Sequence, residues 1–413
     1  MAREMKDSGI QWIGEIPKSW ITTKIKNLPN NEENSYIDGD WIESPYITDN
    51  GIRYLTTGNI GDGHYKEQGD GYISEDTFVA LKCKYAYPGD LVFSRLNEPY
   101  GRSCILPNFH PKYVLAVDNV ILRTNENKSY ICYISQCKGF QNSVLDMARG
   151  TTMKRISRIN LGSVIIPLPS NKEQNLIASF LDSKCAEIDK AIKATKASIE
   201  EYKKLRQAII TEAVTTEDIP RQKFKYCAIV KANLVHPEDY QEMYQVAPDN
   251  IEKDTGRILF DSVKSVKECG VISDNHLFYK GQILYSKIRP ILNKVTIAPF
   301  DGLCCADMYP IETNNNTKYL VYSMLSADFL RQVKAITEER VKMPKINQEE
   351  LGEIIIGVPS ISKQEEIVEV LDSKCSEIDS LIKSKEKLIE ELTAYRKSLI
   401  FEYVTGKKEV PAV

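Results

Sequence analysis

The sequence predicts a mixed α/β protein in which two globular domains are separated by two long helices. The helices are expected to pair antiparallel, which gives the molecule pseudo-twofold symmetry and a circular topology. The first observation is an internal repeat in the 413 residues: LDSKCAEIDKAI and LDSKCSEIDSLI begin at residues 181 and 371, 190 residues apart, and share nine of twelve residues. The second is the heptad spacing of apolar residues in both segments, which is typical of paired helices.

The repeat divides the chain into five parts. A period of this length exceeds the roughly 20–50 residues of solenoid units, so it indicates a duplicated domain. Short strand-like runs separated by Gly and Asn turns predict the mixed α/β parts. The predicted parts are a first globular domain at 1–168, a helix at 169–215, a second globular domain at 216–358, a helix at 359–406 and a tail at 407–413.

Each predicted helix has about 40 residues, without Gly or Pro, and a length of about 60 Å. Ser170 or Asn171 is a candidate N-cap of the first helix, Ser360 or Ser362 of the second, and Gly406 supplies a C-terminal stop. We expect the two seams to pair with each other; the alternative is a surface helix packed on a globular core. The residues predicted to pair are Leu181, Ile188, Ile192, Ile199, Leu371, Ile378, Ile382 and Ile389.

The globular domains repeat more faintly than the helices. Residues 88–95 (PGDLVFSR) align with residues 280–287 (KGQILYSK), and in each a cation directly follows a strand-like run. Further on, Val117-Asp118 resembles Ala306-Asp307. Two domains with two different targets would diverge in this way, and so would loops under neutral drift.

Composition places few limits on the function. A formal charge of −3 and a pI near 6.0 argue mildly against nucleic-acid binding, although a binding face needs only local positive charge. Ten scattered cysteines without Cys-x-x-Cys, and four histidines, make a disulfide framework or a metal site unexpected and indicate a reducing cytoplasm. No apolar run is long enough for a signal peptide or a membrane span.

The sequence lacks the motifs of common catalytic sites. There is no Gly-x-x-x-x-Gly-Lys-Ser/Thr loop, no Gly-x-Ser-x-Gly elbow and no His-Glu-x-x-His. Residues 97–100 read NEPY and differ from the NPPY of amino-methyltransferases, because Glu98 replaces the first proline. We therefore expect a binding protein with no catalytic residues.

Several segments together resemble the specificity subunit of type I restriction–modification systems. Residues 8–17 (SGIQWIGEIP) resemble its opening segment, and IPLP at 166–169 followed by Glu173-Gln174 is similar to its entry into the first spacer helix. Residues 285–290 (YSKIRP) and 341–347 (VKMPKIN) resemble motifs of its target-recognition domains. The second helix entry lacks the usual Glu before Gln364, and the second half lacks a Trp-Ile-Gly segment.

The resemblance implies a non-catalytic DNA-reading subunit. In that family each target-recognition domain reads one half of a bipartite, asymmetric site in double-stranded DNA, and spacer helices hold the two domains apart. The implied partners are two methyltransferase subunits, with restriction subunits as further candidates and no membrane. This chain is expected to bind no cofactor, and S-adenosylmethionine is expected on the methyltransferase subunits.

We predict DNA contacts from cations, hydroxyls and amides in three segments of each globular domain. The rival hypothesis is a coiled-coil scaffold that joins two protein-binding domains without DNA. In the first domain the predicted DNA-binding residues are Arg53, Tyr54, Thr57, Asn59, Ser94, Arg95, Asn97, Arg149, Thr151, Thr152, Lys154 and Arg155. In the second domain they are Ser286, Lys287, Arg289, Asn293, Lys294, Arg340, Lys342 and Lys345.

Overall fold

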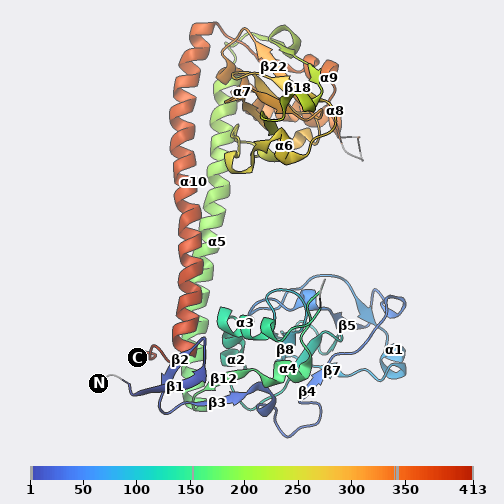
Figure 1. The fold of residues 1–413 in the computed structure, drawn as a ribbon, viewed down its shortest axis with the longest axis vertical. Helices are drawn as coiled ribbons and strands as arrows, with labels where there is room; N and C mark the ends of the chain where they lie inside the picture. The colour runs from blue at the N-terminus through green and yellow to red at the C-terminus, as the bar shows by residue number, and fades with distance from the viewer. Residues whose placement is uncertain (1–2, 151–152, 339, 341–343, 412–413) are drawn as a thin grey trace. The chain divides into compact units, whose positions relative to one another are not determined.

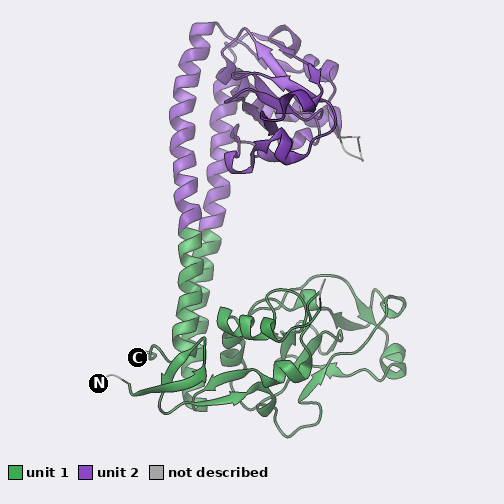
Figure 2. Ribbon diagram, viewed as in Figure 1, with its two compact units in different colours: residues 1–194, 388–413 green, residues 195–387 purple. Residues whose placement is uncertain are grey.

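Two compact units make up the chain, and each contains one globular part and portions of both long helices. The computed structural model describes residues 3–150, 153–338, 340 and 344–411. Unit 1 comprises residues 1–194 and 388–413, and unit 2 comprises residues 195–387 (Figure 2). Unit 1 is therefore assembled from both ends of the chain, whereas unit 2 is one continuous segment. The predicted mixed α/β fold with two globular parts and two long helices is confirmed (Figure 1).

Unit 1 holds two four-stranded sheets, in the orders β4-β11-β8-β9 and β6-β5-β10-β7. Within them only β5 and β10 pair parallel. Two further pairs are the hairpin β1-β2 and the pair β3-β12. Its strands are β1 (Met5–Ile10), β2 (Gly14–Pro17), β3 (Ile21–Lys24), β4 (Tyr36–Asp38), β5 (Ile52–Leu55), β6 (Tyr72–Ile73), β7 (Tyr85–Ala86), β8 (Leu91–Ser94), β9 (Ser103–Ile105), β10 (Tyr113–Leu115), β11 (Asn119–Leu122) and β12 (Ile165–Leu168). Its short helices are α1 (Glu75–Ala80), α2 (Lys128–Ser135), α3 (Lys138–Asp146) and α4 (Arg158–Ser163).

Unit 2 repeats the two sheets, one of them with a fifth strand, and its described residues hold no counterpart of the β1-β2 hairpin. A four-stranded sheet has the order β14-β22-β19-β20, a five-stranded sheet has the order β15-β18-β21-β16-β17, and β13 pairs with β23. Its strands are β13 (Arg221–Lys223), β14 (Ala228–Val230), β15 (Leu234–Val235), β16 (Tyr244–Val246), β17 (Lys264–Ser265), β18 (Asn275–Phe278), β19 (Ile283–Ser286), β20 (Val295–Ile297), β21 (Gly302–Cys304), β22 (Met308–Thr313) and β23 (Ile355–Gly357). Its short helices are α6 (Val266–Cys269), α7 (Thr317–Leu325), α8 (Ala327–Thr337) and α9 (Gln348–Glu353).

The long helices are α5 (Asn171–Thr215) and α10 (Ile361–Val404), whereas the sequence predicted helices at 169–215 and 359–406. Ser170 and Ser360 precede them, and each side-chain hydroxyl accepts a hydrogen bond at 3.4 Å from the third helical residue, Glu173 or Lys363. Because the free N–H groups of a first turn need such acceptors, the two serines are the helix caps.

The two long helices pack together, as their heptad seams predicted. In unit 1, Leu181 and Ile188 of α5 share a buried core with Leu399 and Val404 of α10. In unit 2, Ile210 of α5 shares a core with Leu371 and Cys375 of α10. The start of each helix thus meets the end of the other, so the pairing is antiparallel. Of the predicted seam residues, Leu181, Ile188, Ile199, Leu371, Ile378 and Ile382 are buried, whereas Ile192 and Ile389 are half-buried.

Repeated polar contacts explain why the sequence repeats at particular residues. Gln174 is fully buried, accepts a hydrogen bond from the Asn127 N–H at 2.9 Å and donates to the Pro169 carbonyl at 2.9 Å. Gln364 is also fully buried and makes the equivalent bonds to the Asn316 N–H at 2.8 Å and to the Pro359 carbonyl at 2.9 Å. Each glutamine fixes the start of a long helix to its globular part.

The end of α10 lies against the N-terminal segment of unit 1, as the circular topology predicted. Gly406 follows the helix with a φ of +71°, and a Cβ there would lie 2.4 Å from Cδ of Pro17. Lys407 Nζ donates to the Glu15 carbonyl at 2.6 Å, and the Tyr130 hydroxyl donates to the Val404 carbonyl at 3.0 Å. Only glycine combines this backbone conformation with this close approach.

Candidate nucleic-acid interface

A turn at the end of β8 brings distant segments of unit 1 together. After the strand, Ser94 Oγ donates to the Leu96 carbonyl at 3.0 Å, and the Arg95 N–H donates to the Asp118 carbonyl at 2.8 Å. The Ile156 N–H donates to the Arg95 carbonyl at 3.1 Å, and Leu96 forms a β-bridge with Arg155. We call this turn (residues 94–97), with the loop 149–155 beside it, the first strand-end site.

Unit 2 builds the same turn after β19. Ser286 Oγ donates to the Ile288 carbonyl at 3.0 Å, and the Lys287 N–H donates to the Asp307 carbonyl at 2.9 Å. The Ile346 N–H donates to the Lys287 carbonyl at 2.9 Å, and Ile288 forms a β-bridge with Lys345. We call this turn (residues 286–289), with residues 340–345, the second strand-end site. The segments that the sequence aligned only faintly therefore have the same backbone geometry.

Cations of the first strand-end site are held by two aspartates. Arg95 is 6% exposed and its guanidinium lies 3.2 Å from Oδ1 of Asp38, whose Oδ2 is 3.0 Å from Arg158 Nε. Arg155 Nε lies 2.5 Å from Oδ1 of Asp118. Burial lowers the pKa of the Arg95 guanidinium, and the Asp38 carboxylate opposes that effect. Arg155 and Arg158 keep more than a third of their side-chain surface exposed, so they are open to an incoming anion.

The loop beside this turn presents cations outward. The N–H groups of Arg149 and Arg155 each donate to the other residue's carbonyl at 2.9 Å, which closes the loop at its base. Gly150 has a φ of +122°, and a Cβ there would lie 2.4 Å from the Met153 carbonyl oxygen. Arg149 and Lys154 are exposed. The predicted contacts Thr151 and Thr152 lie outside the described residues.

Among the described residues, the second strand-end site has fewer exposed cations without an ion-pair partner than the first. Lys287 is half-buried, with Nζ 5.3 Å from the ring centroid of Tyr309, and Arg289 is exposed. Lys345 Nζ lies 3.4 Å from Oδ1 of Asp307. Arg340 pairs with Glu350, and this guanidinium lowers the pKa of the Glu350 carboxyl. Lys342 lies outside the described residues.

Several predicted contacts lie inside the protein, and we reassign them to supporting roles. Arg53 is 2% exposed and donates to the carbonyls of Gln68 at 2.9 Å and Gly69 at 2.6 Å, besides pairing with Glu67 at 3.0 Å. Asn59 is 2% exposed and holds the same loop through the Gln68 carbonyl at 2.8 Å. A guanidinium or amide used in this way has no face open to a phosphate. The other predicted contacts with less than 9% exposure are Tyr54, Ser94, Arg95, Ser286 and Asn293.

The remaining predicted contacts are more accessible. Asn97 is exposed in the left-handed region with a φ of +64°, and Thr57 is half-buried. Lys294 keeps 15% of its side chain exposed and donates to the Pro248 carbonyl at 2.8 Å. Sequence reasoning missed Arg102, Arg158 and Asp38. The sequence resemblance between residues 117–118 and 306–307 could have identified Asp118 and Asp307 as part of the two sites.

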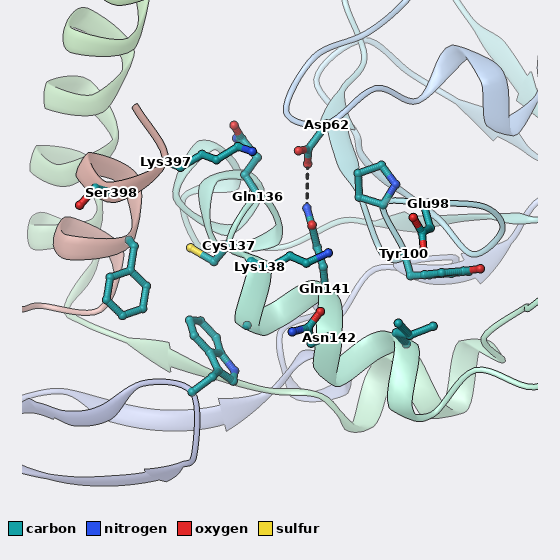
Figure 3. A pocket seen from close by; sticks show the side chains of 15 residues that line it. Asp62, Glu98, Tyr100, Gln136, Cys137, Lys138, Gln141, Asn142, Lys397 and Ser398 are labelled. Carbon is teal, nitrogen blue, oxygen red and sulfur yellow. Dashed lines mark hydrogen bonds between the residues drawn. The ribbon is translucent and has the colours of Figure 1, made fainter. Parts of the chain in front are cut away.

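A cavity of about 840 Å³ in unit 1 is lined by residues of α3 and of the end of α10, among them Gln141, Asn142 and Lys397 (Figure 3). On its wall Gln141 Nε2 donates to Oδ1 of Asp62 at 3.2 Å, and burial raises the pKa of that carboxyl. Glu98 and Tyr100, which follow the turn, line the same cavity. Within the described part of the chain, no group of three His, Cys, Asp or Glu side chains is placed to hold a metal ion. No helix in that part combines the length and the apolar character needed to cross a membrane.

Two strand-end sites on one duplicated fold define a protein with two related candidate binding sites, and comparison with known families identifies its class. Residues 11–201 and 245–394 match the family model described as the type I restriction modification DNA specificity domain. The chain belongs to this family. The resemblance seen in the sequence is therefore confirmed.

Relatives and solved structures agree with this family. The specificity subunit of the type I restriction enzyme EcoDI from Escherichia coli is 31% identical over 65% of this chain and 68% of its own length. A putative type I restriction enzyme MjaX specificity subunit from Methanocaldococcus jannaschii is 25% identical over 96% of each chain. A chain from a structural study of complex assembly and conformational transition of the type I R-M system superposes with a TM-score of 0.71. At 11% identity, over 95% of this chain and 99% of that one, this likeness shows the fold. The HsdS subunit from Thermoanaerobacter tengcongensis gives a TM-score of 0.50 at 12% identity, over 95% of this chain and 98% of its own.

Proposed function

We propose that this chain is the DNA sequence-recognition subunit of a type I restriction–modification enzyme, in which each unit reads one half of a bipartite, asymmetric DNA site. The observation that carries the proposal is the strand-end site built twice on one fold. Each copy places exposed cations beside a turn with fixed backbone geometry, and the two copies carry different side chains. Cations such as Arg149 and Lys154 suit phosphates, and a turn with fixed donors suits base edges.

The partners follow from the family and the helix pair. We propose that two methyltransferase subunits dock on the long helices, and that they bind S-adenosylmethionine and carry out the methyl transfer. This chain then acts without a cofactor or catalytic residues of its own, in the cytoplasm where the DNA lies. Restriction subunits are further candidate partners. The exposed faces of the helices support this view, since they carry large apolar side chains such as Leu176, Leu381 and Leu388 among their charged residues.

Methylome sequencing tests the proposal. The chain is expressed together with its methyltransferase subunit in a host without that system, and the methylated motif is read from the genome. We expect two different short specified segments separated by an unspecified spacer. The pure chain without its partner should transfer no methyl groups. Absence of any motif, together with a band-shift that is the same for every duplex in a random pool, would instead favour a scaffold without DNA readout.

A further inference from the structure

Arg102 joins two loops of unit 1 that lie far apart in the sequence. It is 7% exposed, and Nη2 donates to the Thr57 carbonyl at 2.8 Å while Nε donates to the Ile60 carbonyl at 2.6 Å. Nη1 donates to the carbonyls of Leu96 at 3.0 Å and Asn97 at 2.8 Å. One side chain thus holds both the 3-10 turn η3 (Thr57–Asn59) and the turn of the first strand-end site.

Lys294 makes the equivalent connection in unit 2. The Lys294 carbonyl accepts from the Ser286 N–H at 3.0 Å, as the Arg102 carbonyl accepts from the Ser94 N–H at 2.8 Å. Lys294 Nζ donates to the Pro248 carbonyl at 2.8 Å, in the 3-10 turn η6 (Pro248–Asn250). It also lies 3.2 Å from Oδ1 of Asp249, a fully exposed side chain.

The turns η3 and η6 correspond in their own hydrogen bonds. The Thr56 N–H donates to Asn59 Oδ1 at 2.9 Å, and the Ala247 N–H donates to Asn250 Oδ1 at 2.7 Å. The carbonyls that receive Arg102 and Lys294 are therefore the same position of the same turn. We call these two contacts the loop ties.

The Arg102 tie does not serve to balance a buried carboxylate. No carboxylate of the described residues lies within ion-pairing distance of Arg102, so its guanidinium is satisfied by carbonyls alone. Burial lowers the pKa of Arg102, so the charge is kept at a desolvation cost. The loop after the first turn borders the cavity at Glu98 and Tyr100, and Tyr100 also packs against the core of unit 1 (Figure 3). The hydrogen bonds of Arg102 to the Leu96 and Asn97 carbonyls hold the turn that precedes this loop.

We propose that Arg102 and Lys294 are positioning residues for base readout, each setting the sequence specificity of one half-site. This inference rests on the proposed function. Base discrimination needs donors and acceptors held within about 0.5 Å of their productive positions. Phosphate contacts from flexible, exposed cations do not need that precision. Loss of a tie should therefore lower discrimination between bases more than it lowers affinity for DNA as a whole.

The test measures methylation by the complex with its methyltransferase subunits on matched duplexes. One series carries single-base changes in one half of the wild-type motif, and the other carries them in the other half. Arg102→Met and Lys294→Met are compared with wild type, each as the ratio of rates on cognate and changed duplexes. Arg102→Lys keeps the charge and the reach to Thr57, as Lys294 does naturally, and loses the further bonds to the turn. Arg331→Met removes a 73% exposed cation and serves as the control that should change nothing.

We expect Arg102→Met to reduce discrimination about tenfold in one half-site and less than twofold in the other, because one lost base contact has about that value. Lys294→Met should give the mirror image. Arg102→Lys should fall between wild type and Arg102→Met, and it carries the test if Arg102→Met does not fold. Equal loss in both half-sites, or unchanged discrimination in a folded variant, would overturn the proposed role of Arg102 and Lys294 in base readout. A wild-type complex without any base discrimination would instead overturn the proposed function.

Discussion

Arg206 and Arg396 occupy equivalent positions on α5 and α10 but differ in burial. Arg206 lies 3.3 Å from Asp379 with 8% of its side chain exposed, and it also donates to the carbonyls of Asp254 at 3.1 Å and Thr255 at 3.0 Å. Arg396 lies 3.2 Å from Asp189 with 24% exposed, beside a carboxylate that is 56% exposed. One ion pair is thus largely removed from water, whereas its counterpart is largely solvated.

We predict that Asp379→Ala destabilises unit 2 by about 3 kcal/mol, because it leaves the buried Arg206 charge without its carboxylate. Asp189→Ala, at the equivalent position of the other helix, should cost less than about 1 kcal/mol, since it removes a solvated pair. Urea unfolding of the full chain, followed with a probe in each unit, measures both. Equal effects of the two substitutions would mean that burial of the Arg206 ion pair does not raise the cost of breaking it.

We predict that His276 makes the stability of unit 2 depend on pH. The side chain is 5% exposed, its Nδ1 has no partner among the described residues, and burial, with Lys287 nearby, lowers the pKa of the imidazole. A lowered folded pKa means that the unfolded chain takes up the proton first, so stability is complete above about pH 6.5 and is lost as the pH falls below it. Unfolding at pH 8 and pH 5.5 should show this loss. His276→Gln should remove it, whereas His236→Gln, at an exposed position, should not.

The cations of loop 149–155 should set the salt dependence of DNA binding. Replacing Arg149, Lys154 and Arg155 together by Ala should weaken binding to every sequence and lower the slope of log K against log salt by about 0.9 for each lost phosphate contact. Arg155 should contribute least of the three to the slope, because its guanidinium already lies 2.5 Å from the Asp118 carboxylate. Binding titrations with the assembled complex at several salt concentrations measure the slope. An unchanged slope would place this loop away from DNA.

At the residue scale the sequence selected the segments that meet at the two strand-end sites, but not the direction of each side chain. Arg53, Arg95 and Lys154 were equal candidates because all three are cations next to polar loops. Arg53 turns inward because the loop at 67–71 offers it a carboxylate and carbonyls. Arg95 meets Asp38, a residue of another strand. Such partners lie far away in the sequence, and local pattern carries no information about them.

At the scale of elements, the long helices were the most predictable part of the fold. Both repeats have a heptad seam without Gly or Pro, and helix hydrogen bonds depend only on neighbours along the chain. The sheets could not be predicted in the same way. β5 pairs with β10 and β16 with β21, each across about 60 residues, so their register depends on contacts that no short window contains.

A charge in the helix seam should unfold the unit that shares its core. Ile188 is 8% exposed and belongs to the core that also contains Trp20 and Tyr130 of the globular part. Ile188→Asp buries a carboxylate without a partner, which should cost about 3–5 kcal/mol in unit 1 and abolish complex assembly. Lys190→Asp, at an exposed position of the same helix, should change stability by less than about 0.5 kcal/mol. Thermal unfolding and size-exclusion chromatography with the methyltransferase subunit compare the two. Normal assembly of the Ile188→Asp variant with the methyltransferase subunit would mean that the complex does not depend on the helix seam.

At the scale of the whole molecule, the duplication makes the two long helices interchangeable in register. Four residues of α10 complete the core of unit 1: Leu399, Ile400, Tyr403 and Val404. Their counterparts on α5, in the same order, are Ile209, Ile210, Ala213 and Val214. A chain truncated after Thr215 should therefore form an antiparallel dimer in which each copy completes the other. With its methyltransferase subunit it should methylate an inverted repeat of the half-site that unit 1 reads, which methylome sequencing detects.

One contact differs between the two helices and provides a second test of whether they can replace each other. Tyr403 packs against Phe180 with ring centroids 4.6 Å apart, and in the truncated dimer its smaller counterpart Ala213 would not fill that space. Each end of the truncated dimer should lose about 3 kcal/mol, which Ala213→Tyr should recover. Sedimentation equilibrium would show tighter dimers for the truncation with Ala213→Tyr. A monomer in both cases, or an asymmetric methylation motif, would mean that the halves are not interchangeable.

The division of unit 1 between the two ends of the chain also fixes an order of events on the ribosome. Residues 195–387 form unit 2 without help from later residues, whereas the core of unit 1 needs α10 residues such as Leu399 and Val404. At about 5–20 residues per second, the N-terminal part waits roughly 10–45 seconds for them. The reader that is synthesised first is thus the last to finish folding. During that interval the apolar face of α5 from Leu181 to Ile188 stays open to chaperones, or to a second nascent copy on the same messenger RNA.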